Sequence, residues 1–469
     1  MKLKPIEKTS NFDLNIEEIL ENWGIFDGIR EIIANAIDEQ IITRSKDIEI
    51  LQKADKEWLI RDYGRGIHFR HLTMNENKEK LEHPHTIGKF GIGLKDALAT
   101  FNRKGVGCKI KSKYNQIETV KTGKYGFNDI ETLHARISPP KDLDFEGTEY
   151  ILKNVPQQEM ETAKKLFLRF SGDTKLASTS YGEILEKSGD IANIYINGVK
   201  VAEETNFLFS YNITSLTKAI KKALNRERTN VGRSAYTDRV KKILLDTKET
   251  SIAEKLVADL DNFGDYHDEM TWLDIQEHAV KIYSTQGDVV FLSSEEIADN
   301  PKMVDEIKSS GNTIIAIPRK LRERIANSAD IDGNPIRDLY EFEKEYDESF
   351  EYKFVDLNEL DAEERKIYNF TPQIYSLIGG KPNTVNDLKI SETMKKDFTI
   401  FRDSLGVYDP KYQRIIIKRS QLKKIEDYSG TLLHEIAHAD SGARDVDIIF
   451  EEYLTRYLGE LAAKILTTS

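Results

Sequence analysis

The sequence predicts a multidomain α+β protein, and three observations lead to that class. The chain has 469 residues, too many for one hydrophobic core, so we expect two to four domains. Strand-like alternation and helical spacing both occur along the chain, but without the regular strand–helix repeat of a doubly wound sheet. Charged residues make up 32% and hydrophobic residues 39%, which is typical of globular proteins.

Composition and the start of the chain disfavour several classes. No stretch approaches the roughly 20 apolar residues that cross a bilayer, and the polar start, Met1 to Lys8, lacks the apolar core of a signal peptide. The single cysteine, Cys108, cannot form an internal disulfide or a thiolate metal cluster. We therefore expect a cytoplasmic protein without a membrane partner. A net charge of −12 does not favour nucleic acid as a partner, although it leaves that partner open.

The first expected domain covers residues 1–155. Helical spacing runs through residues 14–43, where Gly24 and Gly28 mark a break. A second helix is expected to begin after the glycine cluster at 88–93. Strand-like runs occur at 48–51, 58–60, 106–120, 131–138 and 148–152.

Three further domains are expected, with bounds of 156–275, 276–345 and 346–469. In the first of them, Asn197-Gly198 lies between two alternating runs and predicts a β-hairpin. Apolar runs at 287–292 and 313–317 enclose a helical segment and predict a small βαβ module. The acidic stretch at 341–366 is the best linker candidate.

Polar residues of the first helix suit nucleotide chemistry. Glu31, Asn35 and Asp38 share one helical face, at spacings of four and three. Two carboxylates and an amide so placed suit activation of water and oxygen-rich coordination of Mg²⁺. The competing interpretation is an ordinary solvated helix surface.

Two glycine clusters follow this helix. Asp62 can accept a hydrogen bond from an exocyclic amine, beside Gly64 and Gly66, where the backbone is free to approach a flat base. The run 88–96 ends at a helix start, where unpaired N–H groups favour phosphate. Each cluster alone would more often be a simple turn.

In their order and separation these elements resemble the GHKL ATPase superfamily, of the gyrase, heat-shock chaperone, MutL and MORC type. The resemblance covers about residues 15–155, with the late threonine element at Gly147-Thr148 and an ATP lid at 68–87. It implies a Bergerat α/β sandwich that binds ATP and Mg²⁺. It also implies Glu31 as general base and Asn35 as the Mg²⁺ ligand. The implied nucleotide-binding residues are Asn35, Asp38, Asp62, Gly64, Gly66, Lys89, Gly91, Gly93 and Thr148.

The same resemblance implies a transducer-like α+β region after the first domain, which supplies a cation to the γ-phosphate. A basic run from Lys218 to Lys242, with nine Lys/Arg against two acids, falls there. Arg228 is assigned to that contact, with Arg226 as the alternative, and a solvated helix face is the competing interpretation of the run. An ATP-dependent homodimer is implied by the resemblance alone.

A second motif lies near the end of the chain, in the run from Thr431 to His438. A helix places His434 and His438 one above the other, where they can bind one metal ion. Glu435 then lies beside the ion and can take a proton from water. With a strand at 412–418 before it, this segment resembles zinc-dependent peptidases and implies a mostly helical, zincin-like domain. A buried histidine pair without metal is the alternative.

Catalytic zinc needs a third protein ligand. No histidine follows His438, so the three-histidine arrangement of the metzincin peptidases is excluded. By resemblance to the gluzincin type, Glu451 on the next helix is assigned to that place and Glu452 is the second choice. Asp445 and Asp440 stay open as ligands or as partners of a ligating histidine.

Together the motifs predict an ATPase whose nucleotide state gates a zinc-dependent peptidase that acts on a protein substrate. A protease that is normally silent suits stress response or antiviral defence. The alternative is an ATP-driven clamp on a client protein or DNA, with a structural or inactive zinc domain. A peptidase that a regulatory protein partner switches on also stays open.

Overall fold

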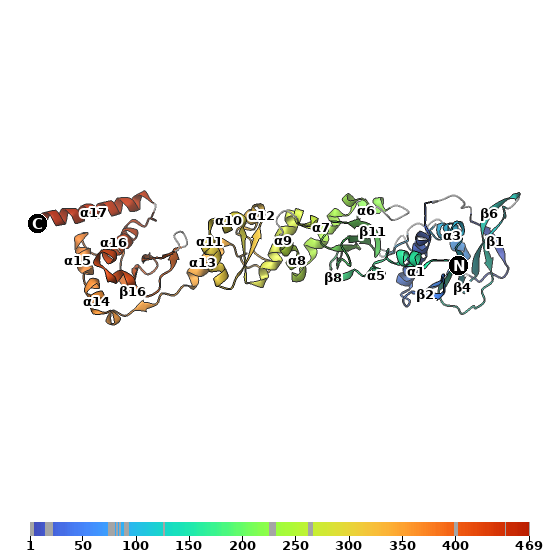
Figure 1. Cartoon of the computed structure of the whole chain (residues 1–469), viewed down its shortest axis with the longest axis horizontal. Coiled ribbons are helices and arrows are strands. Elements are labelled where there is room, and N and C mark those ends of the chain that lie inside the picture. Colours follow the sequence, from blue (N-terminus) through green and yellow to red (C-terminus); the bar gives the residue numbers. More distant parts are fainter. Residues whose placement is uncertain are drawn as a thin grey trace. The chain divides into compact units, whose positions relative to one another are not determined.

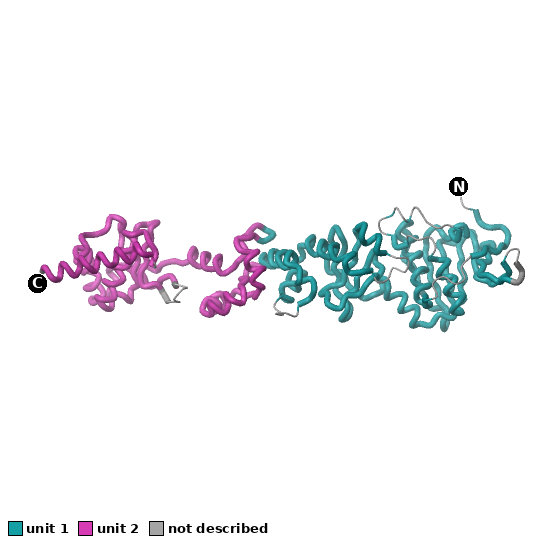
Figure 2. Tube along the Cα trace, turned by 90° about the horizontal axis from the view of Figure 1, so that it is seen from above, with its two compact units in different colours: residues 1–285, 330–332 teal, residues 286–329, 333–469 magenta. Residues whose placement is uncertain are grey.

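The chain divides into two compact units, coloured separately in Figure 2. Unit 1 comprises residues 1–285 and 330–332, and unit 2 comprises residues 286–329 and 333–469. None of the helices described combines the length and apolar character that crossing a membrane requires. The computed structural model describes residues 4–14, 22–73, 80, 83, 86–88, 93–124, 127–224, 231–260, 266–397, 402–445 and 447–468.

The first half of unit 1, drawn in blue to teal in Figure 1, is built on a seven-stranded sheet in the order β1-β6-β5-β4-β7-β3-β2. Every neighbouring pair is antiparallel. Ile32 and Ala36 of α1, Phe101 of α3 and Ile110 of β4 are buried in one cluster, so the two helices share a core with the sheet. The elements are β1 (Ser10–Asp13), α1 (Ile25–Thr43), β2 (Glu49–Ala54), β3 (Glu57–Asp62), α3 (Gly93–Arg103), β4 (Gly107–Ser112), β5 (Gln116–Lys124), β6 (Phe127–Ser138), β7 (Thr148–Lys153), α4 (Gln157–Lys164) and α5 (Leu168–Ser171).

The second half of unit 1 holds a five-stranded sheet in the order β11-β10-β12-β9-β8, in which only β10 and β12 are parallel. The predicted hairpin is confirmed, since Ile196 pairs with Val199 around Asn197-Gly198. Both turn residues have positive φ, 48° and 78°, as a type I′ turn requires. The elements are β8 (Thr174–Ser178), β9 (Gly182–Glu186), β10 (Ala192–Ile196), β11 (Val199–Glu204), β12 (Ser210–Ile213), α6 (Lys218–Ala223), α7 (Thr237–Asp246), α8 (Thr250–Leu260) and α9 (Leu273–Tyr283).

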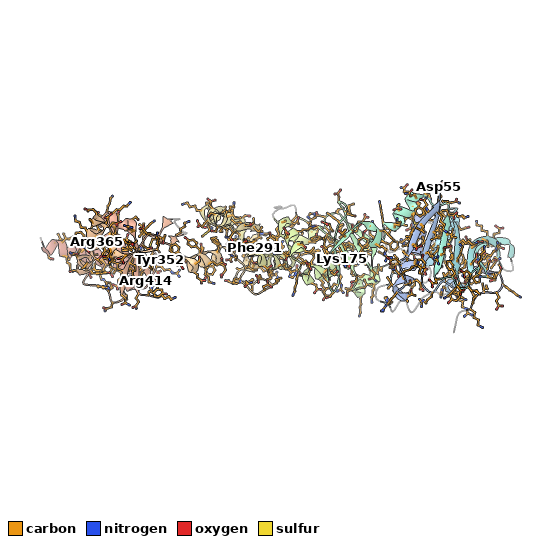
Figure 3. The ribbon with its side chains drawn as sticks, turned by 90° about the horizontal axis from the view of Figure 1, so that it is seen from below. Asp55, Lys175, Phe291, Tyr352, Arg365 and Arg414 are labelled. Atoms are coloured by element: carbon orange, nitrogen blue, oxygen red, sulfur yellow. The ribbon has the colours of Figure 1, made fainter. Side chains whose placement is uncertain are left out.

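Unit 2 begins with a parallel pair of strands, β13 and β14, with helices between them. This arrangement confirms the predicted βαβ module. Phe291, labelled in Figure 3, is fully buried on β13. The elements are β13 (Val289–Ser293), α10 (Ser294–Asp299), α11 (Pro301–Ser309), β14 (Thr313–Ile317), α12 (Arg319–Ile325) and α13 (Leu339–Ser349).

The rest of unit 2 contains a four-stranded mixed sheet in the order β15-β16-β20-β19. Ile415 and Ile417 of β20 are fully buried with Leu432 and Ile436 of α16, so this helix packs on the sheet. The elements are β15 (Phe354–Val355), α14 (Ala362–Tyr368), α15 (Thr371–Leu377), β16 (Asp387–Ser391), β17 (Lys396–Asp397), β18 (Arg402–Asp403), β19 (Gly406–Asp409), β20 (Arg414–Lys418), α16 (Ile425–Ser441) and α17 (Ile448–Thr468).

The predicted class, a multidomain α+β protein, is confirmed, with antiparallel and mixed sheets. The four domain bounds stay predictions. The C-terminal region carries a sheet of which only the strand at 412–418 was expected. The acidic stretch at 341–366 is largely part of α13, β15 and α14 rather than a free linker.

Candidate functional site

The two histidines of the motif lie on one face of α16. His434 and His438 are one helical turn apart, and their Nε2 atoms are 3.2 Å from each other. On the opposite side of the helix Leu432 and Ile436 are fully buried, which fixes its rotation about its axis. The two imidazoles therefore point toward the same place.

A tight turn after α16 orients the second imidazole. Gly442 ends the helix with φ +64°, and its N–H donates to His438 O at 2.9 Å. The chain then places Ala443 O 2.9 Å from His438 Nδ1. This carbonyl holds the proton on Nδ1, so the Nε2 lone pair is free to bind a metal ion.

Asp445 completes a triangle of donor atoms. Its Oδ1 lies 2.9 Å from His434 Nε2 and 3.1 Å from His438 Nε2. Among the residues described, this is the one group of three His, Cys, Asp or Glu side chains whose donor atoms lie close enough together to hold a metal ion. Ligands of a tetrahedral zinc ion with bonds of about 2.0–2.1 Å lie about 3.3 Å apart, so the triangle fits one ion and leaves a fourth corner.

The electrostatics of the triangle suit a neutral imidazole. Burial lowers the pKa of His434, and neighbouring His438 acts in the same direction, while Asp445 opposes both. A neutral imidazole is the form that binds a metal ion.

Phe450, in the first turn of α17, forms one wall of this site. Its ring is buried, stacks on His438 at 4.3 Å between centroids and meets His434 edge-on at 4.9 Å. These contacts restrict rotation of both imidazoles. Sequence reasoning missed Phe450, because an aromatic residue in an amphipathic helix is usually core.

Glu435 is buried between α16 and the neighbouring strand β19. A Cβ at Gly406 would lie 2.8 Å from Glu435 Oε1, so the glycine leaves the room that this carboxyl group occupies. Burial, with a smaller contribution from Asp445, raises the pKa of Glu435 to about 8. A nearby divalent cation would lower that pKa and favour the carboxylate that can act as a base.

The third donor that the structure places with the histidines is Asp445 rather than Glu451. The Gly442 turn brings Asp445 back over α16, whereas Glu451 and Glu452 are exposed on α17, outside the triangle. Asp440 has a different partner set, since its carboxylate accepts from Tyr457 OH at 2.5 Å and Thr384 Oγ1 at 3.1 Å. The bond from Tyr457 ties α16 to α17, the bond from Thr384 ties α16 to the segment before β16, and Asp440 stays outside the triangle.

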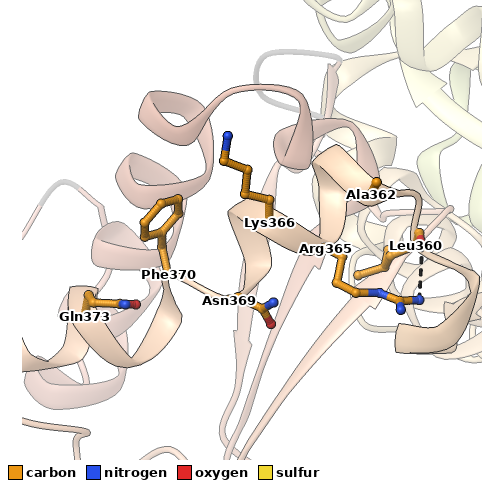
Figure 4. A pocket seen from close by; sticks show the side chains of 7 residues that line it. All are labelled: Leu360, Ala362, Arg365, Lys366, Asn369, Phe370 and Gln373. Atoms are coloured by element: carbon orange, nitrogen blue, oxygen red, sulfur yellow. Dashed lines mark hydrogen bonds between the residues drawn. The ribbon is translucent and has the colours of Figure 1, made fainter.

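A hollow of about 600 Å³ in unit 2 lies elsewhere, beside α14 and α15 (Figure 4). Arg365, Asn369 and Phe370 are among the residues that line it, and none of the triangle's donors is. The Arg365 guanidinium already donates to main-chain carbonyls, including Leu360 O. We therefore place the candidate centre at the convergent donors, not at this hollow.

In unit 1, the two glycine clusters that the sequence singled out lie against α1. A Cβ at Gly93 would come within 2.1 Å of Glu31 Oε2, and one at Gly88 within 2.8 Å of Asp38 Oδ2. A Cβ at Gly64 would lie 2.4 Å from Glu39 Cγ. The glycines therefore allow both clusters to approach the polar face of this helix closely.

The polar face of α1 is already engaged. Glu31 accepts from the buried Arg30 guanidinium at 3.2 Å. Asp38, which is fully buried, accepts from the N–H groups of Ile87 at 2.5 Å and Gly88 at 2.7 Å. Lys80, which sequence reasoning missed, donates to Asp38 and also to Asn35; a lysine in a polar segment gives no signal of this contact.

Asp62 sits at the end of β3, with one carboxylate oxygen fixed by main-chain groups. Its Oδ1 accepts from Gly64 N at 3.0 Å and Thr148 N at 3.2 Å. Thr148 Oγ1 in turn accepts from Ile67 N at 3.1 Å. Burial raises the pKa of Asp62 to about 6. Gly66, with φ +84°, turns the chain close to Gly147 O, where a Cβ would lie at 3.0 Å.

Some predicted nucleotide-site residues lie outside the residues that the structure describes. They are Lys89, Gly91, Arg226 and Arg228. Their assignments stay predictions.

Comparison with known proteins places residues 158–250 in the family of the Mycoplasma pneumoniae MPN635 N-terminal domain. An uncharacterized protein of Mycoplasma pneumoniae (strain ATCC 29342 / M129 / Subtype 1) is 40% identical over 237 residues, 50% of this chain and 95% of that protein. A second uncharacterized protein of the same strain is 23% identical over 352 residues, 68% of this chain and 96% of that protein.

These findings correct the family that the sequence motifs predict. The resemblance to the GHKL ATPases fused to an HExxH peptidase predicts the wrong family, because the matched family is that of the MPN635 N-terminal domain. The physical reason is that glycine turns and polar helix faces recur in many unrelated folds. Any nucleotide or metal chemistry has to be argued from the geometry of this chain itself.

Proposed function

This chain belongs to the family of the Mycoplasma pneumoniae MPN635 N-terminal domain, and we propose that it is a divalent-metal-dependent hydrolase of amide bonds in a protein substrate. One observation carries the proposal. His434 Nε2, His438 Nε2 and Asp445 Oδ1 converge within 3.2 Å of one another. Two imidazoles and a carboxylate with a free corner are a donor set of catalytic zinc.

The residues around the triangle supply the remaining chemistry. When bound, a zinc ion would provide Lewis acidity for the substrate carbonyl and the attacking water. Glu435, held beside the histidines by α16, is placed to accept a proton from that water and return it to the leaving nitrogen. Ala443 O and the Phe450 ring keep His438 oriented.

Strand β19 supports a polypeptide as the substrate. Among the strands described it is the last in its sheet, and its residue Gly406 lies against Glu435. An extended peptide that pairs with this edge would pass the carboxyl group.

We also propose that unit 1 binds ATP with Mg²⁺ and that its nucleotide state gates the hydrolase. One support is the pair of oxygens from Asn35 and Asp38, which already accepts hydrogen bonds from the Lys80 ammonium group. The other is the buried carboxyl of Asp62, which accepts from Gly64 N. Asn197 Nδ2 donates to Thr86 O at 3.4 Å, a contact between the second sheet and the segment bound to Asp38. Homodimerisation, a cytoplasmic location and a role in antiviral defence stay predictions.

The test compares the full chain with two variants of α16. Glu435→Gln removes the proposed base, and Glu426→Gln changes an exposed acid on the same helix. We expect metal analysis to find zinc in all three proteins, and proteomics of expressing cells to find cleavage products that only Glu435→Gln lacks. Identical products with Glu435→Gln would refute the hydrolase. ATP turnover that DNA stimulates, without proteolysis, would favour the alternative clamp.

A further inference from the structure

We propose that the Lys80 ammonium occupies a divalent-cation site formed by Asn35, Asp38 and Gly88, and competes with the metal ion for it. The inference rests on the nucleotide part of the proposed function and adds its regulation. A divalent ion binds only when Lys80 leaves. Unit 1 thus carries its own competitor for that ion.

The contacts of Lys80 define the site. Its Nζ lies 3.0 Å from Asn35 Oδ1 and 3.1 Å from Asp38 Oδ2. Because the two oxygens are three residues apart on α1, they leave the helix on the same side. Asp38 is fully buried and the Lys80 side chain is only 16% exposed, so water screens the charges weakly. An amide oxygen and a carboxylate oxygen therefore already contact one positive charge, the Lys80 ammonium group.

Gly88 makes the room for that charge. A Cβ at this position would lie 2.8 Å from Asp38 Oδ2, 3.6 Å from Lys80 Nζ and 3.8 Å from Asn35 Oδ1. The N–H groups of Ile87 and Gly88 also donate to Asp38 and hold its carboxylate in place. The Asp38 carboxylate is thus held in place by groups other than Lys80 as well.

The chemistry of the donors favours a divalent ion in the place of the ammonium. Magnesium prefers carboxylate and amide oxygens at about 2.0–2.1 Å, with water and phosphate oxygens completing its octahedron. An ammonium group and a divalent ion a few ångströms apart in a poorly screened site repel strongly. Binding of the ammonium group therefore excludes the divalent ion. The apparent affinity for the ion equals its intrinsic affinity multiplied by the fraction of chains in which Lys80 has left the site.

The experiment titrates the full chain with Mn²⁺ as a probe for magnesium and follows free Mn²⁺ by electron paramagnetic resonance. All variants carry His434→Ala and His438→Ala, so that the C-terminal donors do not contribute. Lys80→Met removes the competing charge, while Lys80→Arg retains it. We expect Mn²⁺ affinity to rise about tenfold in Lys80→Met and to stay unchanged in Lys80→Arg. Adding Asn35→Ala to Lys80→Met should reverse the gain.

The outcomes separate the two proposals. Equal Mn²⁺ affinity in the parent and Lys80→Met would overturn the competition but leave the cation site standing. Absence of Mn²⁺ binding from every variant would overturn both. Circular dichroism serves to check that each variant is folded. A rise in the melting temperature of Lys80→Met on addition of Mn²⁺ is the second readout. No such rise would count against the proposal.

Discussion

The buried carboxyl of Asp62 makes the stability of unit 1 depend on pH. Asp62→Asn keeps an oxygen that can accept from Gly64 N and Thr148 N, but removes the group that ionises. Burial raises the pKa of Asp62 in the folded chain to about 6, against an ordinary value of 3.8. The folded state therefore binds the proton more tightly than the unfolded state.

The sign and size follow from linkage. A raised carboxyl pKa contributes stability that is fully present below pH 3.8 and lost as pH rises through about 6. The shift of about 2 units corresponds to about 3 kcal/mol in total. Between pH 5 and pH 8 the loss amounts to about 1–1.5 kcal/mol. The Asp62→Asn variant lacks the ionisable group and does not lose this free energy. Between pH 5 and pH 8 its free energy of unfolding, taken relative to that of wild type, should therefore rise by the same amount.

Urea unfolding at the two pH values measures this difference. With Trp272→Phe in the background, fluorescence comes from Trp23 and Trp58, which are both buried in the first half of unit 1. Asp55→Asn, at an exposed turn between β2 and β3, is the matched control and should show no such growth. The reasoning fails if Asp62→Asn and wild type differ by the same free energy at pH 5 and pH 8.

Three further predictions concern the proposed metal centre. Asp445→Asn should lower zinc affinity about 10- to 100-fold in a chelator competition, whereas Glu451→Gln should leave it unchanged; the reverse pattern would restore Glu451 as the ligand. Phe450→Leu removes a stacking contact of about 0.5–1.5 kcal/mol and should weaken zinc binding about 2- to 10-fold in the same assay. Equal zinc affinity in the variant and wild type would show that the Phe450 ring does not orient the histidines. Gly406→Ala puts a methyl group 2.8 Å from the carboxyl oxygen of Glu435, the proposed base, so peptide cleavage should fall at least about tenfold with zinc content intact; undiminished cleavage would contradict the placement of that carboxyl.

Local patterns in the sequence predicted the features that a few neighbouring residues decide. Asn197-Gly198 predicts its hairpin because both residues tolerate positive φ. The spacing of His434 and His438 places both imidazoles on one face, since a helix repeats every 3.6 residues. The same local patterns misled the family assignment, because glycine clusters and polar helix faces do not distinguish one family from another.

Contacts between distant segments decided the rest. Gly406 is 29 positions before Glu435 and meets it only because β19 packs against α16. Lys80 reaches Asn35 across 45 positions, and no periodicity in either segment indicates that pairing.

By itself, the sequence determined the α+β class, the hairpin turn and the paired histidines, because these depend on backbone preferences and helical repeat within a few residues. Only the tertiary structure decided which acid joins the histidines and which cation meets Asn35 and Asp38. Those choices depend on where turns and packed helices bring side chains together. The spacing of residues along the chain does not predict such contacts between distant segments.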